Sequence, residues 1–201
     1  MPQTAEALIV IDMQVDFCPG GALAVAGGDG IVPGINARMG DFGAVILTQD
    51  WHPAGHGSFA SSHEGRQAFE VIDMPYGAQV LWPDHCVQGT EGAAFHPALG
   101  TDRADLVLRK GFNPRIDSYS AFFENDRRTP TGLHGYLQER GIGALRMVGL
   151  ATDFCVNYSA CDAADLGYAV TVETALCRGI DMDGSMRAAL DGMAARGVSL
   201  V

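Results

Sequence analysis

The sequence predicts a doubly wound α/β fold, with about six strands in a mostly parallel sheet and helices on both of its faces. Short and nearly continuous apolar runs recur along the chain, as in strands that are covered on both faces. Helix-length segments lie between the later runs, and each of these segments ends at a glycine. Strand, helix, glycine and next strand then repeat in that order, which is typical of right-handed βαβ units.

The predicted strands share a short length and a high content of aliphatic residues, and they occupy 7–11, 44–47, 106–108, 145–148, 169–172 and 198–201. The clearest helices are expected at 131–140, 155–166 and 182–196. The segment 51–97 is different, because it is rich in His, Gly, Pro and Ser and contains only two short strand-like pieces. A loop excursion of this length in a compact domain is usually functional, so we expect it to form part of the active site.

Bulk composition limits the function classes. The chain of 201 residues is expected to form a single domain, 1–201, and its net charge of −11 with 13 scattered Lys and Arg residues excludes a basic stripe for nucleic acid. The first residues show no basic n-region, and the apolar run after them is too short to span a membrane. Five cysteines at irregular spacing predict no disulfide framework, so we expect a reduced, cytoplasmic protein.

Polar side chains follow several of the predicted strands. Asp12 follows the first strand, Asp50 the second and Lys110 the third, and the fourth leads to Cys155 at the start of a predicted helix. Taken singly, an Asp at a strand end is more often a turn former, and a Cys is more often a small core residue. The carboxyl ends of parallel strands meet at one edge of the sheet, where ligands bind in open α/β folds. We therefore expect two carboxylates, an amine and a thiol at a common site.

Cys155 is the predicted nucleophile. A helix N-terminus and a nearby cation such as Lys110 both favour the thiolate, so we expect the pKa of this thiol to be lowered. The backbone N–H groups at the helix start suit the oxyanion of a tetrahedral intermediate. Asp12 is suited to accept the thiol proton and to deliver it later to a leaving amine. Cys86, beside His85, is the only serious rival for the role of nucleophile.

Several histidines in the excursion suggest a metal ion. Asp50, His52 and His56 follow the second strand closely, and His85 lies later in the same excursion. A carboxylate with imidazoles suits a divalent transition metal, and few protein ligands leave positions open for a substrate. Histidines in loops are, however, often exposed or capping residues, so the spacing alone leaves both interpretations open.

These segments together resemble the nicotinamidase (pyrazinamidase) branch of the isochorismatase-like cysteine hydrolases. The resemblance covers nearly the whole chain and is carried by IDMQVDF at 11–17, TQDWHP at 48–53, SF at 58–59, WPDHCVQGT at 82–90, RKG at 109–111, DSYSAF at 117–122 and GLATDFCV at 149–156. One such segment is a weak signal, whereas all of them in this order are a strong one.

The resemblance implies a catalytic triad of Asp12, Lys110 and Cys155. It implies one divalent ion, zinc, iron or manganese, bound by Asp50 and by two histidines, with His56 as a ligand in some members only. The ligand set is then Asp50, His52 and His85, with His56 tentative.

The resemblance also implies the substrate and the walls of its pocket. The expected reaction is hydrolysis of nicotinamide to nicotinate and ammonia in NAD salvage, with pyrazinamide as a further substrate, and a homo-oligomer remains open. The positions that enclose an aromatic carboxamide are Phe17, Trp82 and Tyr119. A cis peptide at Leu150-Ala151 is implied, with the backbone N–H groups of Ala151 and Cys155 as the oxyanion hole.

Three alternative functions compete with this one, two from the same superfamily and one from a different class. A metal-independent amidohydrolase of the same superfamily, acting on a carbamoyl or ureido substrate, would share the Asp, Lys and Cys residues but would lack the Asp50, His52 and His85 set. Isochorismatase itself is disfavoured, because Cys155 occupies the position that its mechanism leaves without a nucleophile. A dinucleotide-binding module is disfavoured because Pro33 stands where G-x-G-x-x-G, begun at Gly28, requires its third glycine.

Overall fold

The computed structural model describes residues 5–201 and contains a six-stranded sheet in which every pair of neighbouring strands is parallel. The strand order is β5-β2-β1-β6-β7-β8. The strands are β1 (Ala5–Ile11), β2 (Ala44–Asp50), β5 (Leu106–Lys110), β6 (Ile142–Leu150), β7 (Ala169–Arg178) and β8 (Ser199–Leu200). Each one contains or overlaps a predicted apolar run, so the prediction of a doubly wound parallel sheet is confirmed.

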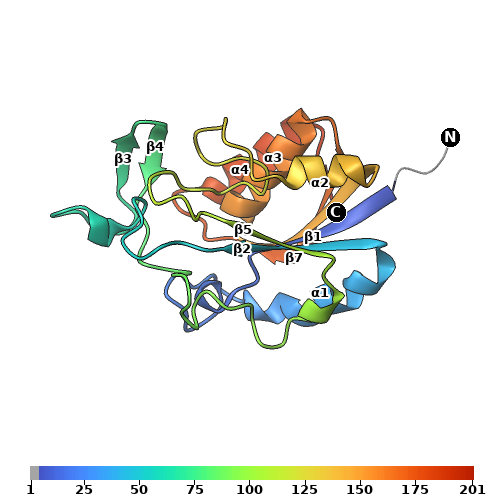
Figure 1. Ribbon diagram of the computed structural model, residues 1–201, viewed down its shortest axis with the longest axis horizontal. Coiled ribbons are helices and arrows are strands. Elements are labelled where there is room, and N and C mark those ends of the chain that lie inside the picture. Colours follow the sequence, from blue (N-terminus) through green and yellow to red (C-terminus); the bar gives the residue numbers. More distant parts are fainter. Residues whose placement is uncertain (1–4) are drawn as a thin grey trace.

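Helices cover both faces of the sheet. Figure 1 shows α2 (Leu133–Glu139), α3 (Asn157–Asp165) and α4 (Ser185–Ala195) on one face and α1 (Val32–Arg38) on the other. Short 3₁₀ helices lie at Val15–Phe17, Asp29–Ile31, Met39–Asp41, Ala60–Ser62 and Thr101–Arg103. The three predicted helices are present but shorter than expected, and the glycines after them are left-handed, with φ of 65° at Gly141, 90° at Gly167 and 76° at Gly197.

The start of the second predicted helix, 155–166, differs from expectation. Residues Thr152–Val156 form a π-helical turn, and α3 begins only at Asn157. The N–H of Val156 donates to the carbonyl of Ala151 at 3.1 Å, which is the five-residue spacing of a π-turn. Cys155 therefore lies in this wide turn and not at the first position of the α-helix.

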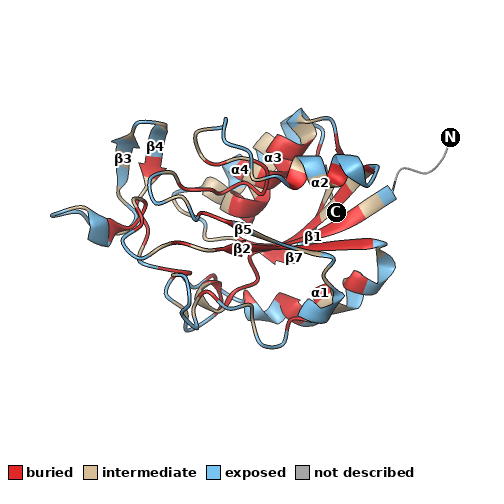
Figure 2. Cartoon of the chain, viewed as in Figure 1, coloured by how far each residue is buried: buried red, intermediate tan, exposed pale blue. Residues whose placement is uncertain are grey.

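The excursion after β2 forms a separate small hairpin. Strands β3 (Val71–Met74) and β4 (Gly77–Val80) pair antiparallel, which confirms the two short strand-like pieces. Figure 1 shows this hairpin beyond the carboxyl end of the main sheet, and Figure 2 shows that it is mostly exposed.

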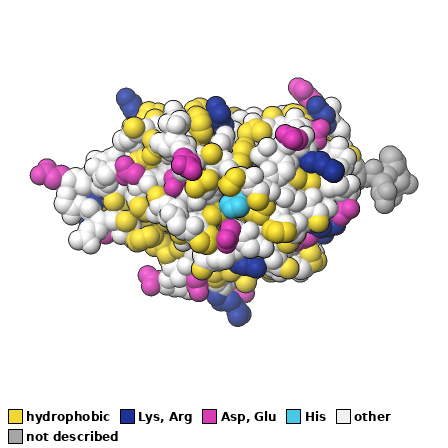
Figure 3. Space-filling model, turned by 90° about the horizontal axis from the view of Figure 1, so that it is seen from below, with side chains coloured by type: hydrophobic (Ala, Val, Ile, Leu, Met, Phe, Trp, Pro, Cys, Tyr) yellow, Lys and Arg dark blue, Asp and Glu magenta, His cyan; other side chains and the backbone are white. Residues whose placement is uncertain are grey.

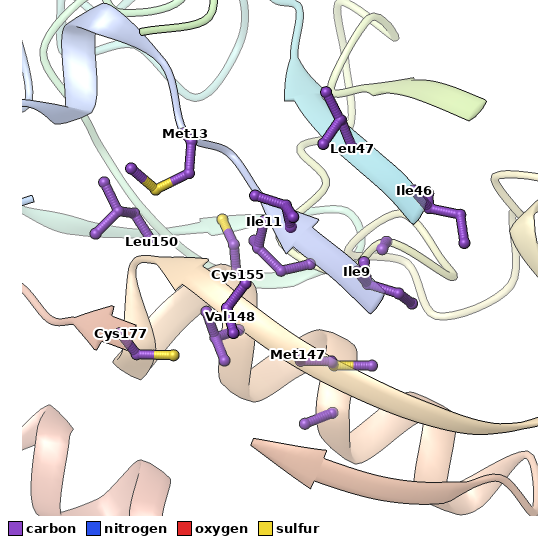
Figure 4. Close-up of a cluster of buried hydrophobic side chains, with 14 of the residues drawn as sticks. Ile9, Ile11, Met13, Ile46, Leu47, Met147, Val148, Leu150, Cys155 and Cys177 are labelled. Atoms are coloured by element: carbon purple, nitrogen blue, oxygen red, sulfur yellow. The ribbon is translucent and has the colours of Figure 1, made fainter. Parts of the chain in front are cut away.

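The core follows the two central strands. β2 is buried along its whole length and β1 over its last five residues, whereas the edge strand β5 alternates between partly exposed and buried positions. Figure 2 shows buried side chains along the sheet. Figure 4 shows Ile9 and Ile11 of β1 and Met147 and Val148 of β6 in one buried cluster, to which Cys155 also belongs.

The surface has charges of both signs. On the face seen in Figure 3, the Lys and Arg side chains are separated from one another by apolar and uncharged surface. No helix within residues 5–201 has the length and apolar character needed to cross a membrane. Residues 1–4, which contain most of the stretch where the sequence shows no basic n-region, lie outside the described part of the chain.

Candidate active site

Four predicted residues meet at the carboxyl edge of the sheet. Asp12 follows β1, Asp50 ends β2, Lys110 ends β5, and Cys155 lies in the turn after β6. Ligand atoms of Asp12, Asp50 and Cys155 lie within 4.8 Å of one another, and all three side chains are buried. In Figure 4 the sulfur of Cys155 points toward the chain between Ile11 and Met13, where Asp12 is located.

Lys110 connects these groups. Its Nζ lies 2.9 Å from Asp12 Oδ2, 2.5 Å from Asp50 Oδ1 and 3.5 Å from Cys155 Sγ, and it donates to the carbonyl of Ser118 at 2.9 Å. The amine is fully buried, so it is stable there as a cation only because two carboxylates face it. Burial alone lowers the pKa of Lys110, but Asp12 and Asp50 outweigh that effect and raise it well above its usual value.

Asp12 is fixed by its neighbour on β2. It adopts a left-handed φ of 46°, a conformation that Asp tolerates better than most residues. Its N–H donates to Thr48 Oγ1 at 3.1 Å, and the Thr48 hydroxyl donates back to Asp12 Oδ1 at 2.6 Å. Oδ2 has no well-oriented hydrogen bond within residues 5–201 besides its ion pair with Lys110. This carboxylate oxygen is therefore available for a proton from the thiol.

The protonation of Cys155 differs from the expectation. Burial raises the pKa of the Cys155 thiol, Lys110 lowers it, and the carboxylates of Asp12 and Asp50 raise it again, so that it lies well above its usual value. The sequence-based prediction of a lowered pKa was wrong, because it counted the one cation but neither the burial nor the second carboxylate. Burial also raises the pKa of Asp12. A thiol whose pKa is raised needs a base within reach to react as a nucleophile.

Asp50, His52 and His85 form a set of donors that fits a metal ion. His52 Nε2 lies 3.6 Å and His85 Nε2 lies 3.8 Å from Asp50 Oδ2, and one ligand atom from each residue lies within 4.8 Å of the others. The Nδ1 atoms of the two rings are 2.8 Å from the carbonyl oxygens of Gly111 and Pro83, and these contacts direct both Nε2 lone pairs inward. His52 Nε2 is buried and has no hydrogen-bond partner in the described chain.

Gly111 leaves room for the ring of His52. It has a φ of +69°, and a Cβ atom added to it would lie 2.5 Å from His52 Cε1. If this set binds a divalent ion, we expect Gly111→Ala to tilt the His52 ring and to weaken that binding by about 10- to 100-fold, as a disturbed orienting contact usually does. Zinc titration with a competing chelator measures this. Gly135→Ala is the matched control, because a Cβ there meets nothing within 4 Å. Equal zinc affinity in the two variants would contradict the expectation.

His56 lies close by but is engaged elsewhere. A ligand atom of His56 lies within 4.8 Å of one from His52 and one from Asp117. Both of its ring nitrogens are nevertheless in use, since Nδ1 pairs with Ser58 Oγ at 2.8 Å and Nε2 with the Asn113 carbonyl at 2.7 Å. Neither nitrogen is directed at Asp50 and His85 in the way that His52 Nε2 is.

A small aromatic pocket connects the thiol to the metal-binding set. The three predicted wall residues line it, together with Asp50, His85, Ala151 and Cys155. Trp82 and Tyr119 meet edge to face at 6.1 Å between ring centroids. The peptide Leu150-Ala151 is cis, as the resemblance implied. A pocket with this mostly aromatic lining and a few polar groups suits a flat ring with a polar substituent.

Some residues of the site were not predicted. Gln14 clamps the backbone of Asp50, since its amide donates to the Asp50 carbonyl at 2.8 Å and accepts from the Asp50 N–H at 2.7 Å. Leu23, Phe154, Ile180 and Asp117 complete the pocket lining. Gln14 and Asp117 stand inside the segments that carry the resemblance, so their position in a shared motif was the available signal. Nothing in the local pattern distinguishes Leu23 or Ile180.

Cys86 is not equipped to act as a nucleophile. Cys86 does not line the aromatic pocket, whereas Cys155 does. The pKa of Cys86 is raised by burial and by nearby carboxylates, as that of Cys155 is. Its N–H donates to Asp16 Oδ2 at 2.7 Å, which holds the chain next to His85. All five cysteines are buried and free of disulfides.

A buried Cys, Asp and Lys at the carboxyl edge of a parallel α/β sheet, beside a set of metal donors, define the class of cysteine-dependent hydrolases. The chain belongs to the isochorismatase domain family, whose pattern matches residues 6–201.

Two Acinetobacter proteins resemble this chain over nearly its whole length. The chain is 55% identical over 195 residues to the nicotinamidase of Acinetobacter baylyi, covering 97% of this chain and 91% of that protein. The solved nicotinamidase pyrazinamidase of Acinetobacter baumanii superposes with a TM-score of 0.97 at 52% identity, over 100% of this chain and 97% of the other.

Two further structures contain small ligands. PnC1 from L. infantum, in complex with nicotinate, has a TM-score of 0.86 at 40% identity, over 98% of this chain and 92% of the other. The pyrazinamidase of Pyrococcus horikoshii, in complex with zinc, has a TM-score of 0.78 at 34% identity, over 98% of each chain.

Proposed function

We propose that this protein is a nicotinamidase, which hydrolyses nicotinamide to nicotinate and ammonia and also accepts pyrazinamide. The observation that carries the proposal is a thiol, a carboxylate and an amine in contact at the base of an aromatic pocket, with a metal-donor set on the same pocket. The relatives named nicotinamidase, with identities up to 55% over nearly the whole chain, support the same activity.

Cys155, Asp12 and Lys110 are the proposed catalytic residues. Asp12 takes the proton of the thiol as Cys155 Sγ attacks the carboxamide carbon, and Asp12 then delivers this proton to the departing ammonia. The raised pKa of Asp12 suits this exchange, because burial makes the carboxylate a better base. Water next attacks the thioester carbon, Asp12 again accepts a proton, and nicotinate leaves as the Cys155 thiol re-forms.

Lys110 is proposed to hold the reacting groups in place. It lies within 3.5 Å of both Asp12 and Cys155, so it orients the carboxylate toward the thiol and stabilises the thiolate that forms during attack. The backbone N–H groups of Ala151 and Cys155 are proposed to stabilise the oxyanion of the tetrahedral intermediates.

One divalent ion is proposed to be bound by Asp50, His52 and His85, with zinc, iron and manganese as candidates and with His56 outside the ligand set. The fixed Nδ1 atoms of both rings and the unpartnered His52 Nε2 support this assignment. Such an ion would supply a binding position for the pyridine nitrogen of the substrate. Phe17, Trp82 and Tyr119 are proposed to enclose the ring.

The test is ammonia release from nicotinamide by the purified protein, with Asp12→Asn as the matched variant. We expect the wild type to release one ammonia per nicotinate, and Asp12→Asn to lower kcat by about 10²-fold or more, because the amide keeps the shape but cannot accept the proton. The carbamoyl- and ureido-hydrolase alternative predicts no ammonia from nicotinamide in either protein. Full activity in Asp12→Asn would show that another group is the base.

A further inference from the structure

Gln79 is a fully buried polar residue that the proposed mechanism does not use. It lies in β4 of the small hairpin, and it is the only buried residue of the eight in β3 and β4. Burial of an amide without hydrogen bonds is unfavourable, so a side chain whose only task was to anchor the hairpin would be better apolar. The contacts of Gln79 explain why an amide is present.

The amide group of Gln79 has partners at both of its atoms. Nε2 lies 3.0 Å from Asp117 Oδ2, 2.8 Å from Tyr119 Oη and 2.7 Å from the Val80 carbonyl. Oε1 accepts from Asn125 Nδ2 at 3.1 Å and from the Tyr76 hydroxyl at 3.2 Å. The nitrogen carries two hydrogens and has three acceptors within 3.0 Å, so at least one hydrogen is shared between two of them. All three neighbours of the nitrogen are acceptors and both neighbours of the oxygen are donors, which fixes the orientation of the amide.

These contacts reach two walls of the pocket. Tyr119 Oη accepts a hydrogen bond from Gln79 Nε2 and a second one from Trp82 Nε1 at 3.1 Å. Gln79, Tyr119 and Trp82 therefore form a chain of hydrogen bonds from the hairpin to two rings that line the pocket. The phenol oxygen is held between two donors, which fixes both ring planes with respect to each other.

We propose that Gln79 is a positioning residue for substrate binding, which holds Tyr119 and Trp82 in the orientation that accepts a flat ring. The proposal rests on the proposed function for the identity of the ring. Gln79 makes no hydrogen bond to the thiol or to Asp50, His52 and His85, and its partner Asp117 lies 3.9 Å from His52 Nε2. We therefore expect its contribution to fall on binding and not on the chemical steps. A pocket that is already ordered binds its ligand without an ordering penalty, and this advantage is lost when the rings become mobile.

The main test is Gln79→Met, which keeps the length of the side chain and removes both polar atoms. We expect KM for nicotinamide, and Kd for nicotinate, to rise about tenfold while kcat stays within about threefold, as for a lost buried hydrogen bond outside the reaction centre. Gln67→Met is the matched control, because it makes the same change at an exposed position of the same excursion. Tyr76→Phe removes a hydroxyl that touches only the far side of the amide, and it is expected to have little effect.

A spectroscopic readout separates positioning from a general loss of stability. The chain contains two tryptophans, so a Trp51→Phe background leaves Trp82 as the only one. In this background, Gln79→Met is expected to shift Trp82 emission to longer wavelength and to increase its quenching by acrylamide. Tyr119→Phe is expected to do the same, because it removes the same bond from the other side. The double variant should then add little to either single one.

The results that would overturn the role of Gln79 differ from those that would overturn the proposed function. A KM within twofold of wild type in a Gln79→Met protein of unchanged Tm overturns the proposal, as does a fall in kcat alone or a fully additive double variant. If Gln79→Met does not fold, an unchanged KM and Trp82 spectrum in Tyr119→Phe overturns it instead. Failure of the proposed function gives a different result, since the wild type then releases no ammonia while the Trp82 spectrum still reports on the rings.

Discussion

Cys155→Ala is expected to lower turnover of nicotinamide by at least about 10⁴-fold, because no thioester can form without the sulfur. The side chain is buried and lines the pocket, and the substitution removes only its thiol group. Folding and substrate binding should therefore persist. Ammonia release measures the first effect, and equilibrium binding of nicotinamide to the inactive variant measures the second. Wild-type kcat in Cys155→Ala would contradict the assignment of the nucleophile.

The other cysteines provide controls for this result. Cys86→Ala tests the rival nucleophile, and Cys161→Ala makes the same change two turns further along the same helical run. We expect both variants to keep most of the wild-type kcat, since neither of these thiols lines the pocket. Mass spectrometry of the wild type, quenched during turnover, should find the acyl group on the peptide that contains Cys155 and on no other.

The architecture could be predicted from sequence because each part of it has a local signal. Buried parallel strands appear as continuous apolar runs, and the glycines after the helices appear at the positions that need a left-handed backbone. The convergence of Asp12, Asp50, Lys110 and Cys155 then follows from topology, because parallel strands end at the same edge. No contact between these residues had to be known in advance.

The electrostatic environment of the Cys155 thiol could not be predicted from local sequence signals. The sequence shows that Lys110 and a helix start are near Cys155, but the direction of the thiol pKa depends on burial and on the total charge around it. Asp12 and Asp50 together outnumber the one ammonium, and burial adds to their effect. Those quantities arise only from the three-dimensional packing.

Hydrogen bonds between residues that are distant in the sequence could not be predicted either. His56 has the spacing of a ligand, but its Nε2 is occupied by the carbonyl of Asn113, which lies 57 residues away. Gln79 lies in a short and mostly exposed hairpin, and its role depends on Tyr119, which lies 40 residues away. In both cases the residue type is ordinary and only the partner reveals the role.

His52→Ala is expected to lower kcat/KM for nicotinamide by about 10³-fold, because the variant loses a proposed metal ligand and with it the ion proposed to orient the substrate ring. His52 and the thiol lie on different strand ends, so the ion should act at a distance from the attacked carbon. Benzamide has no ring nitrogen, and we expect it to be a poor substrate whose kcat/KM changes little in His52→Ala. Metal content measured by mass spectrometry should fall in the variant irrespective of activity.

The two substrates together distinguish what the ion does. If the ion holds the ring nitrogen, the penalty of His52→Ala applies to nicotinamide and largely spares benzamide. His56→Ala is the control within the same cluster, since both nitrogens of His56 already have partners, and it should retain the metal. Equal loss for nicotinamide and benzamide would mean that the ion supports the fold or the attacking water instead. Full metal content in His52→Ala, with loss of metal in His56→Ala, would show that the ligand set is His56-based and that the assignment of His52 is wrong.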